Sequence, residues 1–191
     1  MRIGLFFGSF NPVHVGHLVI ANYMSEFTDL DNVWFVVSPH NPLKDKSTLL
    51  NPYDRLDLVR RALRDYTSLT VTDIEFKLPQ PSYTIDTLIY LKDKYPDKEF
   101  ALIMGSDNLE TIPKWKNFEQ LIGNYHIYVY PRPNSDGGEL KTHPNVHITE
   151  APYMQISSSF IRKSIKEKKD VQYYMPEKVS EYVSEMHLYE K

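Results

Sequence analysis

The chain alternates between short, nearly continuous apolar runs and longer stretches whose apolar residues recur at helical spacing. Continuous apolar runs of this length are typical of strands buried on both faces, and the helical spacing predicts amphipathic helices. Strands are predicted at residues 2–7, 32–38, 69–76, 99–104, 126–130 and 145–149. Helices are predicted over residues 18–24, from 52, over 84–95, in a short patch around 118–122, over 158–168 and from 176.

This order of elements predicts an α/β fold, a Rossmann-like doubly wound parallel sheet with helices on both faces and helices at its C-terminal end. The expected strand order is 3-2-1-4-5, followed by a short sixth strand. Ligands of such sheets bind beyond the carboxyl ends of the strands where the order reverses, here between strands one and four. The turns at 8–17 and 105–108 should therefore flank one crevice. No repeat or linker interrupts the pattern, so residues 1–191 are expected to form a single domain.

The helix from residue 52 shows how local signals support these assignments. Asn51 is a suitable N-cap, and Pro52 suits the first helical position. The apolar residues Leu56, Val59 and Leu63 predict a buried side. Arginines are expected around the rest of this helix, namely Arg55, Arg60, Arg61 and Arg64.

Composition narrows the class of protein. Of 191 residues, 41% are hydrophobic and 25% charged, which is ordinary for a globular protein. The net charge of −3 gives no basic footprint for nucleic acid. The chain has no cysteine, which excludes disulfides and thiolate chemistry and fits a reducing compartment. With no signal-peptide pattern and no apolar run of membrane length, a cytoplasmic protein without a membrane partner is expected. The composition does not indicate an oligomeric state.

Residues 8–17, Gly-Ser-Phe-Asn-Pro-Val-His-Val-Gly-His, form the most informative stretch. A tight turn between a strand and a helix presents backbone N–H groups and a positive dipole end, which favour a phosphate. His14 and His17 then lie on one face of the first helical turn. Neither Gly-x-Gly-x-x-Gly nor Gly-Lys-Ser/Thr occurs here, which argues against a dehydrogenase-type dinucleotide site and a P-loop. A zinc site is disfavoured, because no Glu follows in an H-E-x-x-H frame and no cysteine is present to complete a tetrahedron.

This stretch resembles the first signature of the His-x-Gly-His nucleotidyltransferase superfamily. The second signature, Ile-Ser-Ser-Thr-x-Ile-Arg, is matched at residues 156–162, with Ser159 in place of the usual Thr. Further blocks at 81–88, 105–109 and 114–115 make the whole chain similar to the bacterial nicotinate-nucleotide adenylyltransferase family. The resemblance implies transfer of AMP from ATP to nicotinic acid mononucleotide, with nicotinic acid adenine dinucleotide and pyrophosphate as products. It also implies in-line attack, no covalent intermediate, Mg²⁺ carried by the ATP phosphates, and no metal site of the protein's own.

The resemblance assigns a role to each matching position. His14, His17 and Arg162 would be catalytic, stabilising charge on the ATP phosphates. The remaining ATP-binding residues would be Gly8, Ser9, Phe10, Gly16, Gly105, Asp107, Ile156, Ser157 and Ser158. Those that bind the nicotinate nucleotide would be Asn11, Lys44, Tyr83, Thr84, Asp107, Trp115 and Arg132.

Simpler interpretations stay open for several of these residues. A histidine at a helix start can be a cap or surface residue, Ser157 can be a plain N-cap, and Trp115 can fill a gap in the core. The remaining histidines have no such sequence context and are expected to be structural: His40, His126, His143, His147 and His187. Other functions also stay open: adenylyl transfer to nicotinamide mononucleotide or to phosphopantetheine, and nucleotide binding by a non-catalytic regulator.

Overall fold

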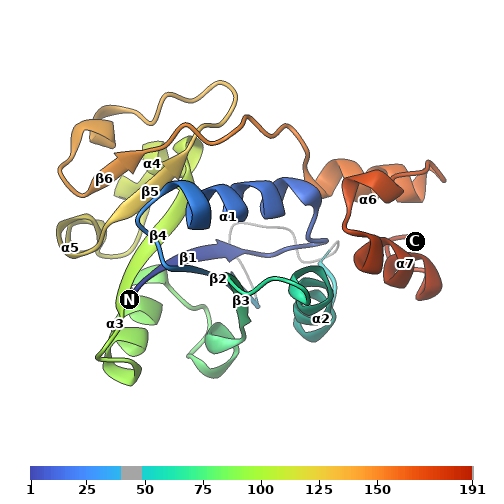
Figure 1. Cartoon of the computed structure of the whole chain (residues 1–191), viewed down its shortest axis with the longest axis horizontal. Coiled ribbons are helices and arrows are strands. Elements are labelled where there is room, and N and C mark those ends of the chain that lie inside the picture. The colour runs from blue at the N-terminus through green and yellow to red at the C-terminus, as the bar shows by residue number, and fades with distance from the viewer. Residues whose placement is uncertain (40–48, 191) are drawn as a thin grey trace.

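The computed structural model describes residues 1–39 and 49–190, which form a six-stranded, fully parallel sheet (Figure 1). The strand order is β3-β2-β1-β4-β5-β6, which confirms the predicted order and puts the sixth strand next to the fifth. The order reverses between β1 and β4, as expected. The strands are β1 (Arg2–Gly8), β2 (Asn32–Val37), β3 (Leu69–Thr72), β4 (Glu99–Gly105), β5 (Ile127–Tyr130) and β6 (Val146–Ile148).

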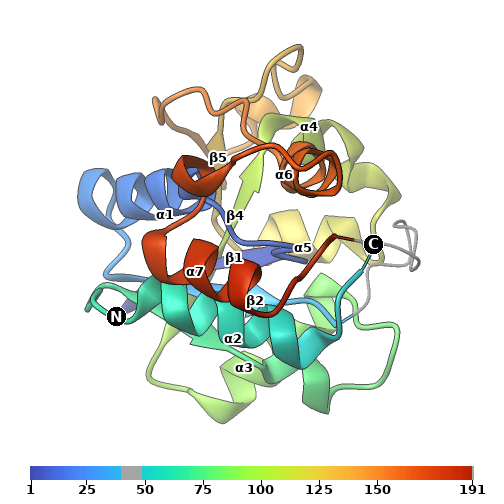
Figure 2. The ribbon, with the colours of Figure 1, turned by 90° about the vertical axis from the view of Figure 1, so that its right-hand side faces the viewer.

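Helices cover both faces of the sheet. In the described residues they are α1 (Val15–Phe27), α2 (Pro52–Leu63), α3 (Thr84–Lys94), α4 (Ser106–Thr111), α5 (Phe118–Asn124), α6 (Ser158–Lys166) and α7 (Glu177–Glu185). In Figure 1, α6 and α7 lie beyond the carboxyl end of β1, and Figure 2 views the molecule from that side. In the part of the chain described, no helix has both the length and the apolar character that a membrane crossing requires.

Two hydrophobic clusters, one on each face, hold these layers together. The first contains residues of α1, α2 and α7, such as Ile20, Val59 and Val179. The second contains residues of α3, α4 and α5, such as Leu88 and Leu121. Side chains of successive strand residues point to opposite faces, so a continuous apolar strand supplies both clusters at once.

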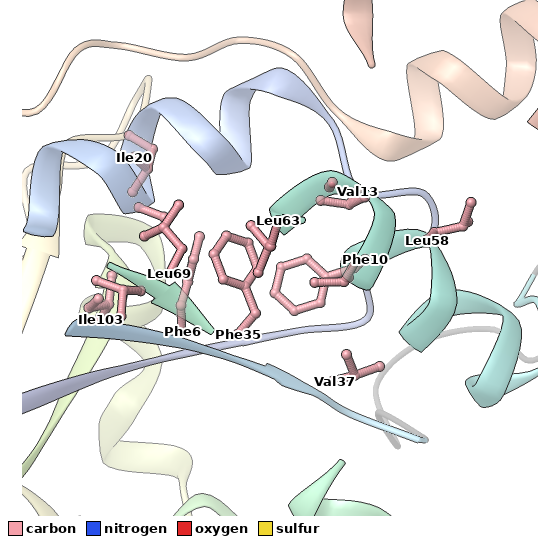
Figure 3. Close-up of a cluster of buried hydrophobic side chains, with 14 of the residues drawn as sticks. Phe6, Phe10, Val13, Ile20, Phe35, Val37, Leu58, Leu63, Leu69 and Ile103 are labelled. Atoms are coloured by element: carbon pink, nitrogen blue, oxygen red, sulfur yellow. The ribbon is translucent and has the colours of Figure 1, made fainter. Parts of the chain in front are cut away.

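Aromatic rings form the part of the first cluster that lies next to the turn after β1 (Figure 3). The ring of Phe10 lies 5.9 Å from that of Phe6 and 5.2 Å from that of Phe35. All three rings are almost completely buried. The turn that carries Phe10 is thereby attached to the core by a large side chain.

The structure corrects three of the local expectations. β3 ends at Thr72, and residues 74–77 form a short 3₁₀ helix instead of continuing the strand, with the Phe76 N–H bonded to the Asp73 carbonyl. This change of direction buries the carboxylate of Glu75, which accepts a hydrogen bond of 3.0 Å from the Thr87 hydroxyl. The expected turn at 105–108 is instead the start of α4.

Helix α2 contains the third correction. Its expected cap is confirmed, because the Asn51 side chain accepts from the Tyr53 N–H at 2.9 Å. Arg55, however, is fully buried and not on the polar surface. Position 55 lies one helical turn before Val59, so it falls on the same buried stripe as that residue.

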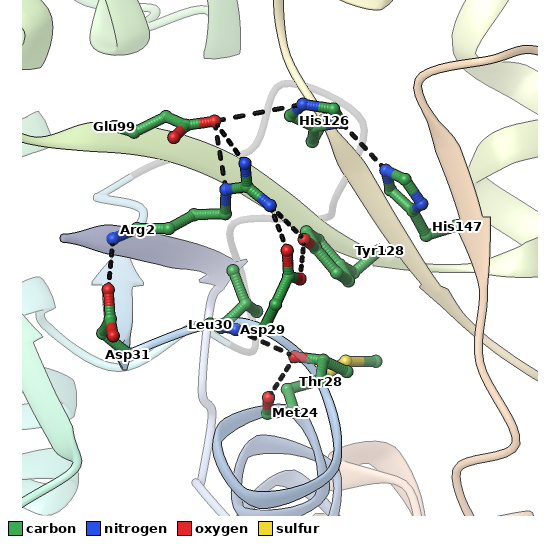
Figure 4. Close-up of polar contacts among 10 residues, drawn as sticks. All are labelled: Arg2, Met24, Thr28, Asp29, Leu30, Asp31, Glu99, His126, Tyr128 and His147. Carbon is green, nitrogen blue, oxygen red and sulfur yellow. Dashed lines mark hydrogen bonds and ion pairs between the residues drawn. The ribbon is translucent and has the colours of Figure 1, made fainter.

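A polar network lies at the amino ends of the strands (Figure 4). The crevice expected between β1 and β4 is at the opposite, carboxyl ends. The Arg2 guanidinium binds Glu99 at 3.0 Å and also Asp29, which in turn accepts from the Tyr128 hydroxyl. Beside it, a nitrogen of His126 lies 2.8 Å from one of His147. The charges of this edge therefore pair with one another and connect β1, β4 and β5 to the turn after α1.

Candidate active site

A cavity of about 570 Å³ lies at the carboxyl ends of β1 and β4, where the predicted crevice was expected. It is bounded by the turn after β1, the first turn of α1, the start of α4, the segment after β5 and the start of α6. Most of the residues expected to bind ATP line it, together with three expected to bind the second substrate, of which Asp107 belongs to both sets. These are Gly8, Ser9, Phe10, Asn11, His14, Gly16, His17, Asp107, Arg132, Ile156, Ser157, Ser158 and Arg162.

The turn between β1 and α1 has an unusual backbone at Phe10. Its φ of 44° lies in the left-handed region, which residues with a bulky side chain rarely adopt. The ring of Phe10 is buried in the aromatic cluster, 5.0 Å from the ring of His17. Burial of this ring offsets the backbone strain, and the same ring packs against the imidazole of His17.

His14 and His17 form a stacked pair at the start of α1. Their ring centroids are 3.7 Å apart, with an angle of 26° between the planes. The backbone N–H of His14 donates to Nδ1 of His17 at 3.2 Å. Nδ1 of His17 is therefore an acceptor, so the neutral ring carries its proton on Nε2. In this tautomer Nε2–H is a hydrogen-bond donor.

The His14 ring is buried, and burial lowers its pKa to about 4, with the positive charge of Arg132 as a second cause. Its Nδ1 has no hydrogen-bond partner among the described residues. His14 is therefore neutral at pH 7. Gly16 makes room for this ring, because a Cβ at position 16 would lie 3.0 Å from Nδ1 of His14.

Hydrogen bonds connect the two sequence signatures directly. The Ser158 hydroxyl donates to the Pro12 carbonyl at 2.9 Å. Arg162 donates to the Asn11 carbonyl at 2.8 Å and to the Ser159 hydroxyl at 3.3 Å. Serine at position 159 thus keeps the hydroxyl contact with Arg162. Ser157 is the N-cap of α6, where its side chain accepts from the Phe160 N–H at 3.2 Å.

Asp107 and Arg132 form the side of the cavity next to β4. The Arg132 Nε lies 3.8 Å from a carboxylate oxygen of Asp107. Gly105 allows this approach, because a Cβ there would lie 2.7 Å from Cγ of Arg132. The same two side chains also line a neighbouring cavity of about 410 Å³, which includes Asn134.

Three residues expected to bind the nicotinate nucleotide do not line the main cavity as the described residues form it, namely Tyr83, Thr84 and Trp115. Tyr83 is the N-cap of α3, and Trp115 is half-buried against the second cluster. Lys116 brings these segments together, because its Nζ lies 4.7 Å from the centre of the Tyr83 ring and 2.8 Å from Asp86, on the first turn of α3. Thr84 is the first residue of that helix. Lys44 lies outside the described residues.

Arg55 is a site-supporting residue that the sequence reasoning did not find. Its guanidinium donates to four main-chain carbonyls, and burial lowers its pKa to about 10, so it stays charged at neutral pH. The acceptors are Ser9 at 2.7 Å, Ser38 at 2.8 Å, Pro39 at 2.8 Å and Leu50 at 3.0 Å. One buried cation thus holds together the turn after β1, the end of β2 and the segment before α2. The helical register of position 55 was the only available signal, and it did not reveal these partners.

A parallel sheet with a cavity at its reversal point, beside two imidazoles at a helix start, has the architecture of a nucleotide-binding α/β protein. The model of the cytidylyltransferase-like family matches residues 5–164. This match covers both signatures, the second half of β1 and the whole of the other five strands.

Close relatives support a narrower family. A protein of Flavobacterium johnsoniae is 57% identical over 193 residues and covers 100% of both chains. One from Flavobacterium psychrophilum is 55% identical with the same coverage. Both are named "Probable nicotinate-nucleotide adenylyltransferase". The chain belongs to the cytidylyltransferase-like family and, within it, to the nicotinate-nucleotide adenylyltransferases.

The fold also matches a solved structure. Plasmodium falciparum nicotinic acid mononucleotide adenylyltransferase, complexed with NaAD, superposes with a TM-score of 0.82 at 20% identity. The match covers 98% of this chain and 97% of the other. At this identity the similarity shows a shared fold.

Because His14 is buried, the free energy of unfolding of this protein should depend on pH. Its pKa is about 4 in the folded protein and about 6.5 in the unfolded chain, so its neutral form favours folding above pH 6.5. As the pH falls from 6.5 to 4, the free energy of unfolding should decrease by about 3 kcal/mol through this residue. Denaturant titrations between pH 7 and 4 measure this decrease. His14→Gln should show a flatter pH dependence than the unchanged protein, and identical slopes would contradict the assignment.

Proposed function

We propose that this chain transfers AMP from ATP to nicotinic acid mononucleotide, a step of NAD biosynthesis that releases pyrophosphate. The observation that carries the proposal is the direct bonding of the two signatures around one cavity, through Ser158 to Pro12 and Arg162 to Asn11. The relatives at 55% and 57% identity are named for this reaction. The Plasmodium falciparum enzyme, which has the same fold, was solved in complex with NaAD.

In the proposed reaction, a phosphate oxygen of the mononucleotide attacks the α-phosphorus of ATP. A new P–O bond forms there as the bond to the β-phosphate oxygen breaks, and pyrophosphate leaves with the electron pair. Such a transfer depends on alignment and on stabilisation of the developing charge. The protein needs no covalent intermediate for it.

Three side chains would provide that stabilisation. Nε2–H of His17 can donate to a phosphate oxygen, because Nδ1 is already an acceptor for the His14 N–H. The neutral His14 ring lies directly against it. Arg162 supplies the positive charge for the β- and γ-phosphates. The backbone of residues 8–10 and the hydroxyls of Ser157 and Ser158 complete the phosphate contacts.

Magnesium would arrive with ATP, held by the phosphates and by water. Mg²⁺ is usually bound in this way, through substrate phosphates and few protein ligands. Within residues 1–39 and 49–190, no three His, Asp or Glu side chains are grouped so that they could hold a metal ion.

The start of α3 is the proposed site for the nicotinate carboxylate. The N–H groups of Tyr83 and Thr84 lie at a helix N-terminus, which favours an anion over a neutral amide. Lys116, above the Tyr83 ring, adds positive charge to the same place. Trp115, the residue before Lys116, offers an indole face for the pyridine ring.

The test of the function is pyrophosphate release from ATP with each acceptor offered separately. Nicotinic acid mononucleotide should be turned over with a kcat/KM about tenfold or more above that of its amide, because the helix end favours the carboxylate. Faster turnover of phosphopantetheine would assign the other adenylyl transfer. Binding of ATP without turnover of any acceptor would indicate a non-catalytic regulator.

His17→Ala should lower kcat by about 10²–10³-fold, because it removes a donor to the charge that develops on the phosphates. The melting temperature should hardly change. Steady-state kinetics and a thermal melt measure the two quantities. His143→Ala, in the segment before β6, is the matched control and should leave kcat within about twofold. A large loss of stability with little loss of rate would show that His17 is structural.

Trp115→Ala should raise the KM for the pyridine nucleotide by about tenfold or more, since base–aromatic stacking contributes about 1–3 kcal/mol. The KM for ATP should stay within about twofold. Both constants come from initial rates at varied concentrations of one substrate. Equal changes in the two constants would show that Trp115 serves the core alone.

A further inference from the structure

Asn11 is the point where the turn after β1 meets three other segments of the described chain. It is only 3% exposed. Its main-chain carbonyl accepts from Arg162 at 2.8 Å. Its side-chain Oδ1 accepts from the Tyr189 hydroxyl at 3.0 Å and from the Leu50 N–H at 3.3 Å. The conformation of this one residue therefore depends on α6, on the segment before α2 and on the segment after α7.

Tyr189 reaches Asn11 because the chain turns back after α7. The Leu188 N–H bonds to the Val183 carbonyl at 3.0 Å, which folds the segment onto the helix. His187 and Tyr189 have φ values of 51° and 67°, in the left-handed region that residues with a Cβ rarely adopt. The Tyr189 ring packs on the first cluster, and its burial offsets this backbone cost.

The hydroxyl of Tyr189 is a reliable donor in this position. Burial raises the pKa of Tyr189 above its ordinary value, so the group stays protonated at physiological pH. The two cations near it, Arg55 and Arg162, have no acceptor for its proton, and each donates to a carbonyl of the turn, at Ser9 and Asn11. The proton of the hydroxyl is thus directed to Oδ1 of Asn11.

We propose that Tyr189 is a positioning residue for the ATP phosphates. Its hydroxyl fixes Asn11, and the carbonyl of Asn11 fixes the guanidinium of Arg162. This inference rests on the proposed function, in which Arg162 neutralises the β- and γ-phosphates. It adds a residue from the last segment of the chain, which no signature motif contains.

The size of the effect separates positioning from folding. One neutral hydrogen bond contributes about 0.5–1.5 kcal/mol, which is small beside the two hydrophobic clusters that hold the fold. The same loss at a residue that orients a charged contact changes ligand affinity by about three- to tenfold. Removal of the hydroxyl should therefore affect ATP binding while the protein remains folded.

The experiment compares Tyr189→Phe with the unchanged protein in direct binding of ATP and of AMP. The Kd for ATP should rise about three- to tenfold, because Arg162 loses its alignment with the β- and γ-phosphates. The Kd for AMP, which lacks both phosphates, should stay within about twofold. The matched control is Tyr182→Phe on α7, a half-buried tyrosine whose ring lies under Arg61 at 3.8 Å. It should change neither constant.

A double-mutant cycle with Arg162→Lys tests the route through Arg162. In that background, Tyr189→Phe should weaken ATP binding by less than about twofold, because the guanidinium that it positions is gone. Equal losses for ATP and AMP, no loss for ATP, or independent effects of the two substitutions would overturn the proposal. These readouts need no acceptor substrate. If the protein binds ATP but turns over no acceptor, the proposed function is refuted. The binding data for Tyr189→Phe would still show whether Tyr189 positions Arg162.

Discussion

The site depends on where the carbonyls of one short turn point. Between β1 and α1, the carbonyls of Ser9, Asn11 and Pro12 accept hydrogen bonds from Arg55, Arg162 and Ser158 in turn. These donors come from α2 and α6, so two helices fix the backbone of the turn. With its carbonyls bound in this way, the turn keeps a fixed shape beside the cavity, next to the start of α1.

Much of the fold could be predicted because its signals are local and repeated. Each apolar run became a strand of the predicted order, and the Asn51–Pro52 cap begins α2 as expected. The errors at Glu75 and Arg55 occur where a polar side chain is buried by partners that the sequence does not reveal. Glu75 lies within an apolar run that resembled a longer strand, but its carboxylate bonds to Thr87 and the chain turns there.

The residues of the site also fall into two groups, those that the sequence could predict and those that it could not. Motif residues of the two signatures meet at one cavity, because a strand–turn–helix junction and a helix N-terminus are local structures that sequence spacing describes well. Arg55 and Tyr189 could not be found by that route. Arg55 bonds to main-chain carbonyls, which every residue has, and Tyr189 bonds to a single amide far away in the sequence. Tertiary packing alone pairs such groups.

The contacts of Asn11 also determine when the site can form during synthesis. Arg162 lies 151 positions along the chain from Asn11, and Tyr189 lies 178 positions away. Folding is slower where contacts join residues far apart in the sequence, and a nascent chain emerges with its N-terminal part first. The first strand and the turn after it therefore leave the ribosome long before their partners. A partly synthesised chain can build much of the sheet, yet Asn11 gains its hydrogen bond from Tyr189 only when residue 189 has emerged.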